Sequence, residues 1–292
     1  MVFEGETAAA FAQWSLELGE LYDAWNTTNR RFAGGAQPNS PAAQDDAVLA
    51  AAFPDLSRPE GTGAGFDAVQ MIDAAAQHLL GLKALVDSQT MVLAPWPVAR
   101  AVGEHLAHAA WLLEPEITPQ ARMARRWMAR VAAAHRMRLV LSERKASNAR
   151  QKEAKNVREG FRKELERRFP GADITWDGLA AEPSWNVGGE SYPGLGKLFK
   201  AFSTLQTTGV TGYYSTLSLY SHPNIVAVSS LSESVDQGDH RFIRYRVDTD
   251  DWGELVRSAT SLTYITARAA CDYLGYPNDD PLKRWLVKYR LS

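Results

Sequence analysis

Apolar residues recur every three or four positions in at least six segments of this chain, whereas apolar and charged residues alternate convincingly in only one. A period near 3.6 is typical of helices that bury one face, and a period of two is typical of strands. We therefore expect an all-α protein, a multi-helix bundle of about eight helices. At most a minor hairpin is expected near 225–248, where residues 240–248 (HRFIRYRVD) alternate.

The expected helices are placed by their apolar stripes and by the residues that begin or end them. They cover residues 7–32, 44–53, 64–88, 97–114, 194–206, 208–222, 250–275 and 280–291. Thr118 caps a further, long basic helical stretch that reaches Phe169. This stretch is either one helix or two helices broken near 146–148.

Composition favours one globular unit. The chain has 292 residues, of which 45% are hydrophobic and 23% charged, with a net charge of −2. These values are ordinary for a globular protein. We expect a single helical domain over 1–292, with a loop-rich stretch at 33–62 and a core bundle at 95–275. A second loop, at 171–194, is expected to pack its aromatic side chains against the body. These are Trp176, Trp185 and Tyr192.

The single cysteine, Cys271, excludes an intramolecular disulfide and any zinc site built from several thiolates. No run of about 18 apolar residues is present, so no membrane-spanning segment is expected. The start, MVFEGETAAA, lacks the basic and apolar regions of a signal peptide, and a cytoplasmic location is therefore expected. We expect no cofactor and no metal.

Positive charge is concentrated between Arg122 and Arg168, where 16 Lys or Arg and 5 Asp or Glu give a local balance of +11. Such asymmetry can mark an anionic partner, and the alternative is a solvated helix face opposed by acidic neighbours. We expect nucleic acid or another protein to bind residues 122–168, and a homodimer stays open as a further alternative. The candidate anion-binding residues are Arg130, Arg136, Arg144, Lys145 and Arg150.

A first polar stripe consists of Arg100, Glu104 and His108, which follow one another at intervals of four residues on one helix face. The stripe is either an internal ion pair or part of a ligand or reaction site. Glu104-His105-x-x-His108 also comes near the histidine spacing of a zinc helix. No further His or Cys lies nearby in the sequence, so a metal site is not expected.

A second polar stripe lies in TGYYSTLSLYSHPN, at Ser215, Ser218 and His222, and Tyr214 is a further candidate to face the same cavity. No G-x-S-x-G elbow and no strand precede the serine, so the hydrolase signature is absent. Pro223 ends the helix, and His222 can then satisfy a carbonyl of the last turn. We expect the two stripes to meet in a polar cavity between the 97–114 and 208–222 helices, because buried polar groups need partners.

Three short motifs occur in a fixed order. An R-x-x-x-E helix ending in Trp-Leu-Leu-Glu-Pro is followed by T-P-x-x-R-x-x-R and later by Y-x-x-x-S-x-Y-x-H-P. The residues are Arg100, Glu104, Trp111, Leu112, Leu113, Pro115, Thr118, Pro119, Arg122, Arg125, Tyr214, Ser218, Tyr220, His222 and Pro223. This order, over roughly 95–275, resembles a group of uncharacterised actinobacterial all-α proteins that are distantly HEPN-like. The resemblance implies an all-helical fold and carries no activity with it.

Ribonucleases of the HEPN superfamily use an Arg-x4-His spacing, which Arg130 with His135 and Arg100 with His105 match. The polar residue that usually follows the arginine is absent from both. The leading hypothesis is therefore a non-catalytic binding or regulatory protein that uses the polar cavity or the basic helix. The alternative is an enzyme acting on RNA or a small molecule, with His108 or His222 as general base.

Overall fold

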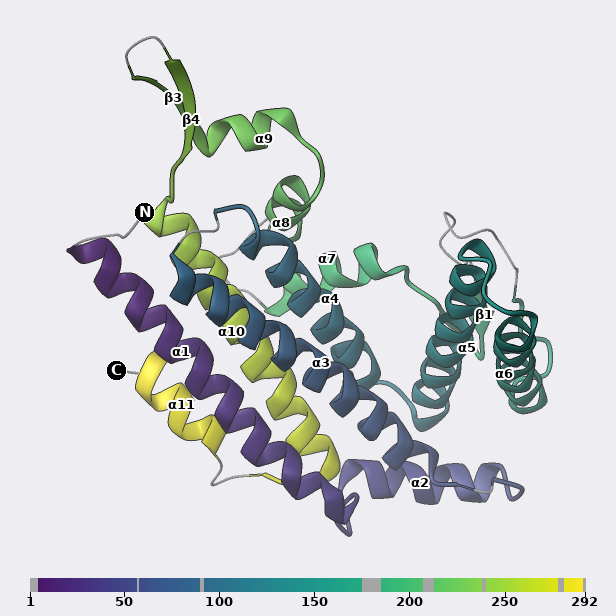
Figure 1. Cartoon of the computed structure of the whole chain (residues 1–292). Helices are drawn as coiled ribbons and strands as arrows, with labels where there is room; N and C mark the ends of the chain where they lie inside the picture. The colour runs from purple at the N-terminus through teal and green to yellow at the C-terminus, as the bar shows by residue number, and fades with distance from the viewer. Residues whose placement is uncertain are drawn as a thin grey trace.

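Four long helices form the centre of the protein (Figure 1). The computed structural model describes residues 5–56, 58–89, 92–174, 185–206, 213–237, 240–277 and 281–290. The central helices are α1 (Glu6–Asn29), α3 (Glu60–Ser88), α4 (Pro95–Leu113) and α10 (Thr249–Leu274). α3 contacts the other three, and α10 also contacts α1 and α4. Their apolar stripes face one another, so that Leu18, Ile72, Leu106 and Leu262 are fully buried.

Shorter helices cover this centre. α2 (Pro41–Ala52) packs on α3, α11 (Pro281–Arg290) packs on α1, and α7 (Leu195–Gln206) and α8 (Tyr213–Ser221) pack on α4. A 3₁₀ helix, η1 (Arg30–Gly34), follows α1, and α9 (Ile225–Ser230) follows α8. Asp46 of α2 accepts hydrogen bonds from the backbone nitrogens of Gly61 and Thr62, at 2.6 and 3.2 Å. This carboxylate therefore caps the first turn of α3.

The basic segment folds into a helical hairpin of α5 (Pro119–Glu143) and α6 (Asn148–Arg168), which lies beside the bundle (Figure 1). The Thr118 hydroxyl accepts a hydrogen bond from the Ala121 nitrogen at 3.2 Å, and a proline occupies the first turn. The chain turns between the helices at Lys145, whose φ is 49°. The start of α5 and the end of α6 therefore lie together at the base of the hairpin, and the turn forms its distal end.

Two small antiparallel hairpins complete the described structure. β1 (Asn186–Val187) pairs with β2 (Glu190–Ser191). β3 (Ser232–Gln237) pairs with β4 (His240–Tyr245), with Ser232 opposite Tyr245 and Gln237 opposite His240. Figure 1 shows that β3 and β4 project beyond one end of the bundle.

The predicted all-α class is confirmed, and the helix count needs correction. The described part of the chain contains eleven α-helices rather than about eight. The long basic stretch, which the sequence leaves open as one helix or two, folds as two helices, α5 and α6. α9 has no counterpart among the expected helices, because six residues are too few to show a periodicity. The hairpin expected near 225–248 is confirmed as β3 and β4.

The aromatic residues of the expected 171–194 loop are largely buried where the structure describes them. Trp185 and Tyr192 are 1% and 8% exposed, and Trp176 lies outside the described residues. The core also extends beyond 95–275, because α1 and α3 contribute many of its fully buried side chains. Over the described ranges, none of the helices has both the length and the apolar character needed to cross a membrane.

Candidate functional site

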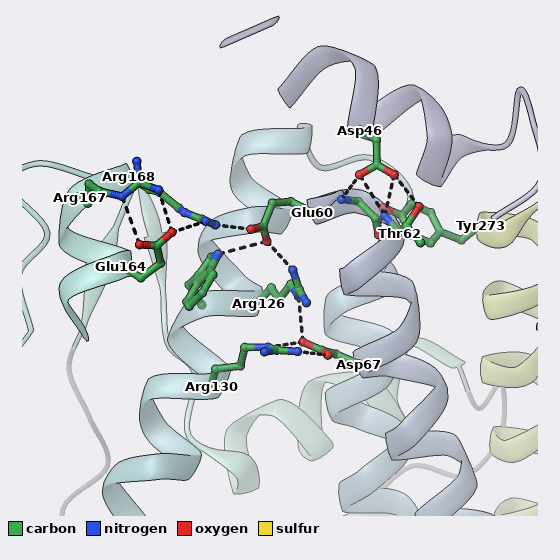
Figure 2. Close-up of polar contacts among 12 residues, drawn as sticks. Asp46, Glu60, Thr62, Asp67, Arg126, Arg130, Glu164, Arg167, Arg168 and Tyr273 are labelled. Atoms are coloured by element: carbon green, nitrogen blue, oxygen red, sulfur yellow. Dashed lines mark hydrogen bonds and ion pairs between the residues drawn. The ribbon is translucent and has the colours of Figure 1, made fainter. Parts of the chain in front are cut away.

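Arginines at the base of the α5–α6 hairpin reach carboxylates on other helices (Figure 2). Glu60, at the start of α3, is only 3% exposed. It accepts hydrogen bonds from Arg126 of α5 and Arg168 of α6, and from the indole nitrogen of Trp127 at 3.2 Å. A buried carboxylate needs such partners, because an unpaired buried charge is costly. The contact fixes the hairpin base to α3.

Asp67, two turns further along α3, forms the second centre of this network. Arg130 donates two hydrogen bonds to its carboxylate at 2.7 and 2.6 Å, and Arg126 donates another at 2.9 Å. Burial alone would raise the pKa of Asp67, but hydrogen bonds from Arg130 and the charges of both arginines outweigh it, and the pKa lies below its usual range. Arg130, a predicted anion-binding residue, is thus paired with an internal carboxylate.

Two further arginines of α5 are buried and paired. The Nε of Arg122 donates to Asp45 at 2.9 Å, and its guanidinium lies 4.6 Å from the centre of the Tyr273 ring. The Nε of Arg125 donates to Glu190 at 2.6 Å. Part of the positive charge of residues 122–168 is therefore matched by carboxylates on other elements. The arginines that bind internal carboxylates are Arg122, Arg125, Arg126, Arg130 and Arg168.

The distal end of the hairpin carries a net positive charge, with Arg144, Lys145, Arg150, Lys152 and Lys155 exposed and Arg136 and Arg138 half-buried. Between Arg136 and Lys155 the chain has seven basic and two acidic residues, a local balance of +5. None of the seven forms an ion pair with a carboxylate in the part of the chain described here. Four of the predicted anion-binding residues belong to this set. Its members, the distal basic residues, are Arg136, Arg138, Arg144, Lys145, Arg150, Lys152 and Lys155.

An apolar groove runs between α5 and α6 at this distal end. Its volume is about 290 Å³, and Arg150 and Glu153 stand among its lining residues. Met137 and Val157 are 58% and 46% exposed and line the same groove, so their apolar surfaces form one patch. The apolar lining residues are Ala134, Met137, Leu141, Ala154 and Val157. The signal in the sequence is the apolar stripe of α5, which continues for two turns past the last buried residue.

The two predicted polar stripes meet in part. Nη1 of Arg100 lies 2.6 Å from Nε2 of His222, and Nε of Arg100 donates to Glu104 at 2.8 Å. The guanidinium also lies 5.6 Å from the centre of the Tyr214 ring. A guanidinium can only donate, so Nε2 of His222 accepts and its proton resides on Nδ1. These contacts join α4 to α8.

The remaining two residues of the predicted cavity lie outside this contact. The hydroxyl of Ser218 is half-buried and makes no hydrogen bond with a described residue. The ring of His108 packs at 5.9 Å from Trp111 on the side of α4 that faces Arg136 and Asp67. Burial, with smaller contributions from the charges of His105 and Arg136, lowers the pKa of His108 to about 4, although the nearby Asp67 opposes this shift. His108 is therefore neutral at pH 7.

The two Arg-x4-His matches differ in their surroundings. Arg130 is paired with Asp67, and His135 is buried within α5. Nδ1 of His105 lies 2.8 Å from the Ala101 carbonyl oxygen, one turn back on its own helix. Among the described residues, no group of three or more His, Cys, Asp or Glu side chains could hold a metal ion.

No protein-family model matches this chain, no curated protein matches it, and no solved structure matches it.

Proposed function

We propose that this protein is a non-catalytic binding protein whose distal α5–α6 surface docks an anionic partner, namely an acidic amphipathic helix of another protein. The observation that carries the proposal is the apolar groove, which Arg150 lines and which lies in a segment with a local charge balance of +5. The paired base of the hairpin supports it, because a docking surface works best on a rigid support.

The groove favours one of the two classes of anionic partner, protein over nucleic acid. Nucleic acid would account for the distal basic residues through its phosphates, but it would leave Met137 and Val157 in water. An amphipathic helix places apolar side chains in a groove and polar ones at its rim. If the polar side chains of such a helix are Asp and Glu, its apolar face can fill the groove while its carboxylates pair with the basic side chains. A protein partner is therefore favoured.

Two observations weigh against the enzyme with a histidine base. His108 is largely buried, and its pKa of about 4 makes it a poor proton acceptor at pH 7. The Nε2 lone pair of His222 already accepts a hydrogen from Arg100. Within the proposal, the Arg100–His222 contact positions α8 on α4 and has no chemical role.

The test is a selection of amphipathic helical peptides displayed on phage. One library carries Asp and Glu on the polar face, and a matched library carries Lys and Arg there. Both vary Leu, Ile, Met and Phe on the apolar face. Binders are expected only from the acidic library, and their affinity should fall as salt is added.

Three variants locate the binding site of a selected peptide. Met137→Ser tests the groove, Arg150→Glu tests the rim, and Arg284→Glu on α11 is a matched exposed control. Only the first two should weaken binding, each by about tenfold. If the acidic library yields no binder, or if Arg284→Glu weakens binding as much, the proposal is wrong. Tight RNA or DNA binding that Met137→Ser leaves unchanged would identify nucleic acid as the partner instead.

A further inference from the structure

A second cavity lies in the bundle itself, between the C-terminal half of α4, helix α7 and the middle of α10. Its volume is about 650 Å³, within the range of small-molecule sites in proteins. The walls are mostly apolar, and small side chains at Ala107, Ala110, Ala201 and Ala269 leave the space open. It is separate from the distal groove and from the contact between Arg100 and His222.

One end of this cavity is polar. Arg125, which is 8% exposed, donates from Nε to Glu190, from Nη1 to the Trp111 carbonyl oxygen at 2.8 Å, and from Nη1 to Glu114. Its other terminal nitrogen, Nη2, makes no hydrogen bond with the described residues. Each of the two carboxylates likewise uses only Oε2 in these contacts. This end therefore keeps both donors and acceptors for a group that enters the cavity.

The charges that line the cavity indicate what kind of polar group a ligand could place at this end. Arg125 and Lys197 are cationic, and Glu114 and Glu190 are anionic, so the formal charges among the described lining residues cancel. A charged ligand would lose its hydration on entering, and the cavity has no net opposite charge to compensate for that loss. A neutral group that both donates and accepts, such as a primary amide, meets Nη2 and the free carboxylate oxygens without that cost.

We propose that this cavity binds a neutral amphiphile, an apolar molecule that carries an amide or a similar donor–acceptor group. The apolar body lies between α4, α7 and α10, and the polar group lies against Arg125, Glu114 and Glu190. This site is independent of the proposed docking surface, since it shares no lining residue with the groove.

The test uses the fluorescence of N-phenyl-1-naphthylamine, a neutral aromatic amine that brightens in apolar surroundings. Decanamide, decanoate and decylammonium, which share one alkyl length, then compete for the cavity at pH 7. Decanamide is expected to displace the dye at a concentration about tenfold lower than either charged competitor. Equal displacement by decanoate or decylammonium, or no dye binding by the parent protein, overturns the proposal.

Variants of the wall and of the polar end separate a site from nonspecific binding. Ala269→Phe fills the cavity and should abolish dye binding, whereas Ala74→Phe, on α3 and likewise half-buried, should not. Ala201→Phe, at an exposed position on α7, blocks the same space if the first variant fails to fold. The pair Glu114→Gln and Glu190→Gln removes two negative charges, and this double variant should now prefer decanoate. If the folded double variant still prefers decanamide to decanoate, the assignment of a neutral polar group to this end is wrong.

Discussion

Glu60, the first residue of α3, accepts a hydrogen bond from Arg168, the last residue of α6, and the two side chains are 2% and 4% exposed. They are 108 positions apart in the chain. Figure 2 shows that Glu60 also lies between Arg126 and the indole next to it on α5. One carboxylate therefore holds both helices of the hairpin against the bundle.

Removing this carboxylate should strongly destabilise the fold. Glu60→Ala leaves Arg126 and Arg168 without their shared partner, and breaking a buried pair in this way costs about 3–5 kcal/mol. Urea unfolding followed by circular dichroism measures the loss. Glu143→Ala, at an exposed position on α5, is the control and should unfold like the parent. A loss below about 1 kcal/mol for Glu60→Ala would mean that water replaces the missing carboxylate.

Removing Glu104 should cost much less. The sequence alone predicts a loss of several kcal/mol, on the premise that the pair with Arg100 is buried. The two side chains are 27% and 19% exposed, so Glu104→Ala is expected to cost less than about 1 kcal/mol. Ser218→Ala should have almost no effect, because its hydroxyl makes no hydrogen bond with the described structure. Thermal melts of both variants test this, and a large loss of stability for Glu104→Ala would instead support a buried Arg100–Glu104 pair, as the sequence predicts.

Stability should fall as the pH drops from about 6.5 toward 4, partly because of His108. Its pKa in the folded protein, about 4, lies below the ordinary value of 6.5. Between these two values the unfolded chain binds more protons, so the contribution of His108 is complete above pH 6.5 and is lost on acidification. The full contribution is about 3 kcal/mol.

The variant His108→Gln should show a flatter dependence of unfolding free energy on pH than the parent. Burial also lowers the pKa of His78, but that titration occurs in both proteins, so their difference isolates His108. Urea unfolding at a series of pH values provides the comparison. Parallel curves for the two proteins would contradict the low pKa.

Two glycines should respond to alanine in opposite directions. A Cβ at Gly103 would lie 2.0 Å from Cζ of Phe199, a fully buried ring that packs α7 on α4. Gly103→Ala should therefore destabilise the protein by about 1–3 kcal/mol. Gly160 lies inside α6 with no atom within 4 Å of its added Cβ, and Gly160→Ala should stabilise by about 0.5–1 kcal/mol. Chemical denaturation distinguishes the two, and equal shifts would contradict the tight α4–α7 contact.

The sequence by itself determined the helices, because their signals are local. Apolar residues at helical spacing placed most of them, and capping residues such as Thr118 placed their ends. The alternation of apolar and charged residues placed β4. Local signals did not decide whether the basic stretch forms one helix or two. Such local signals do not show which helices pack against each other.

Tertiary structure decided which charged residues are available. Arg130 and Arg136 look alike in the sequence, yet Arg130 meets Asp67 from α3 whereas Arg136 lies beyond the paired base. His108 and Arg100 belong to one predicted stripe, but each four-residue step overshoots a full helix turn by about 40°. After two steps, the side chain of His108 faces α5, whereas that of Arg100 faces α8. Such outcomes depend on which helix lies opposite, and a partner 60 or more residues away along the chain, as Asp67 is from Arg130, leaves no local trace.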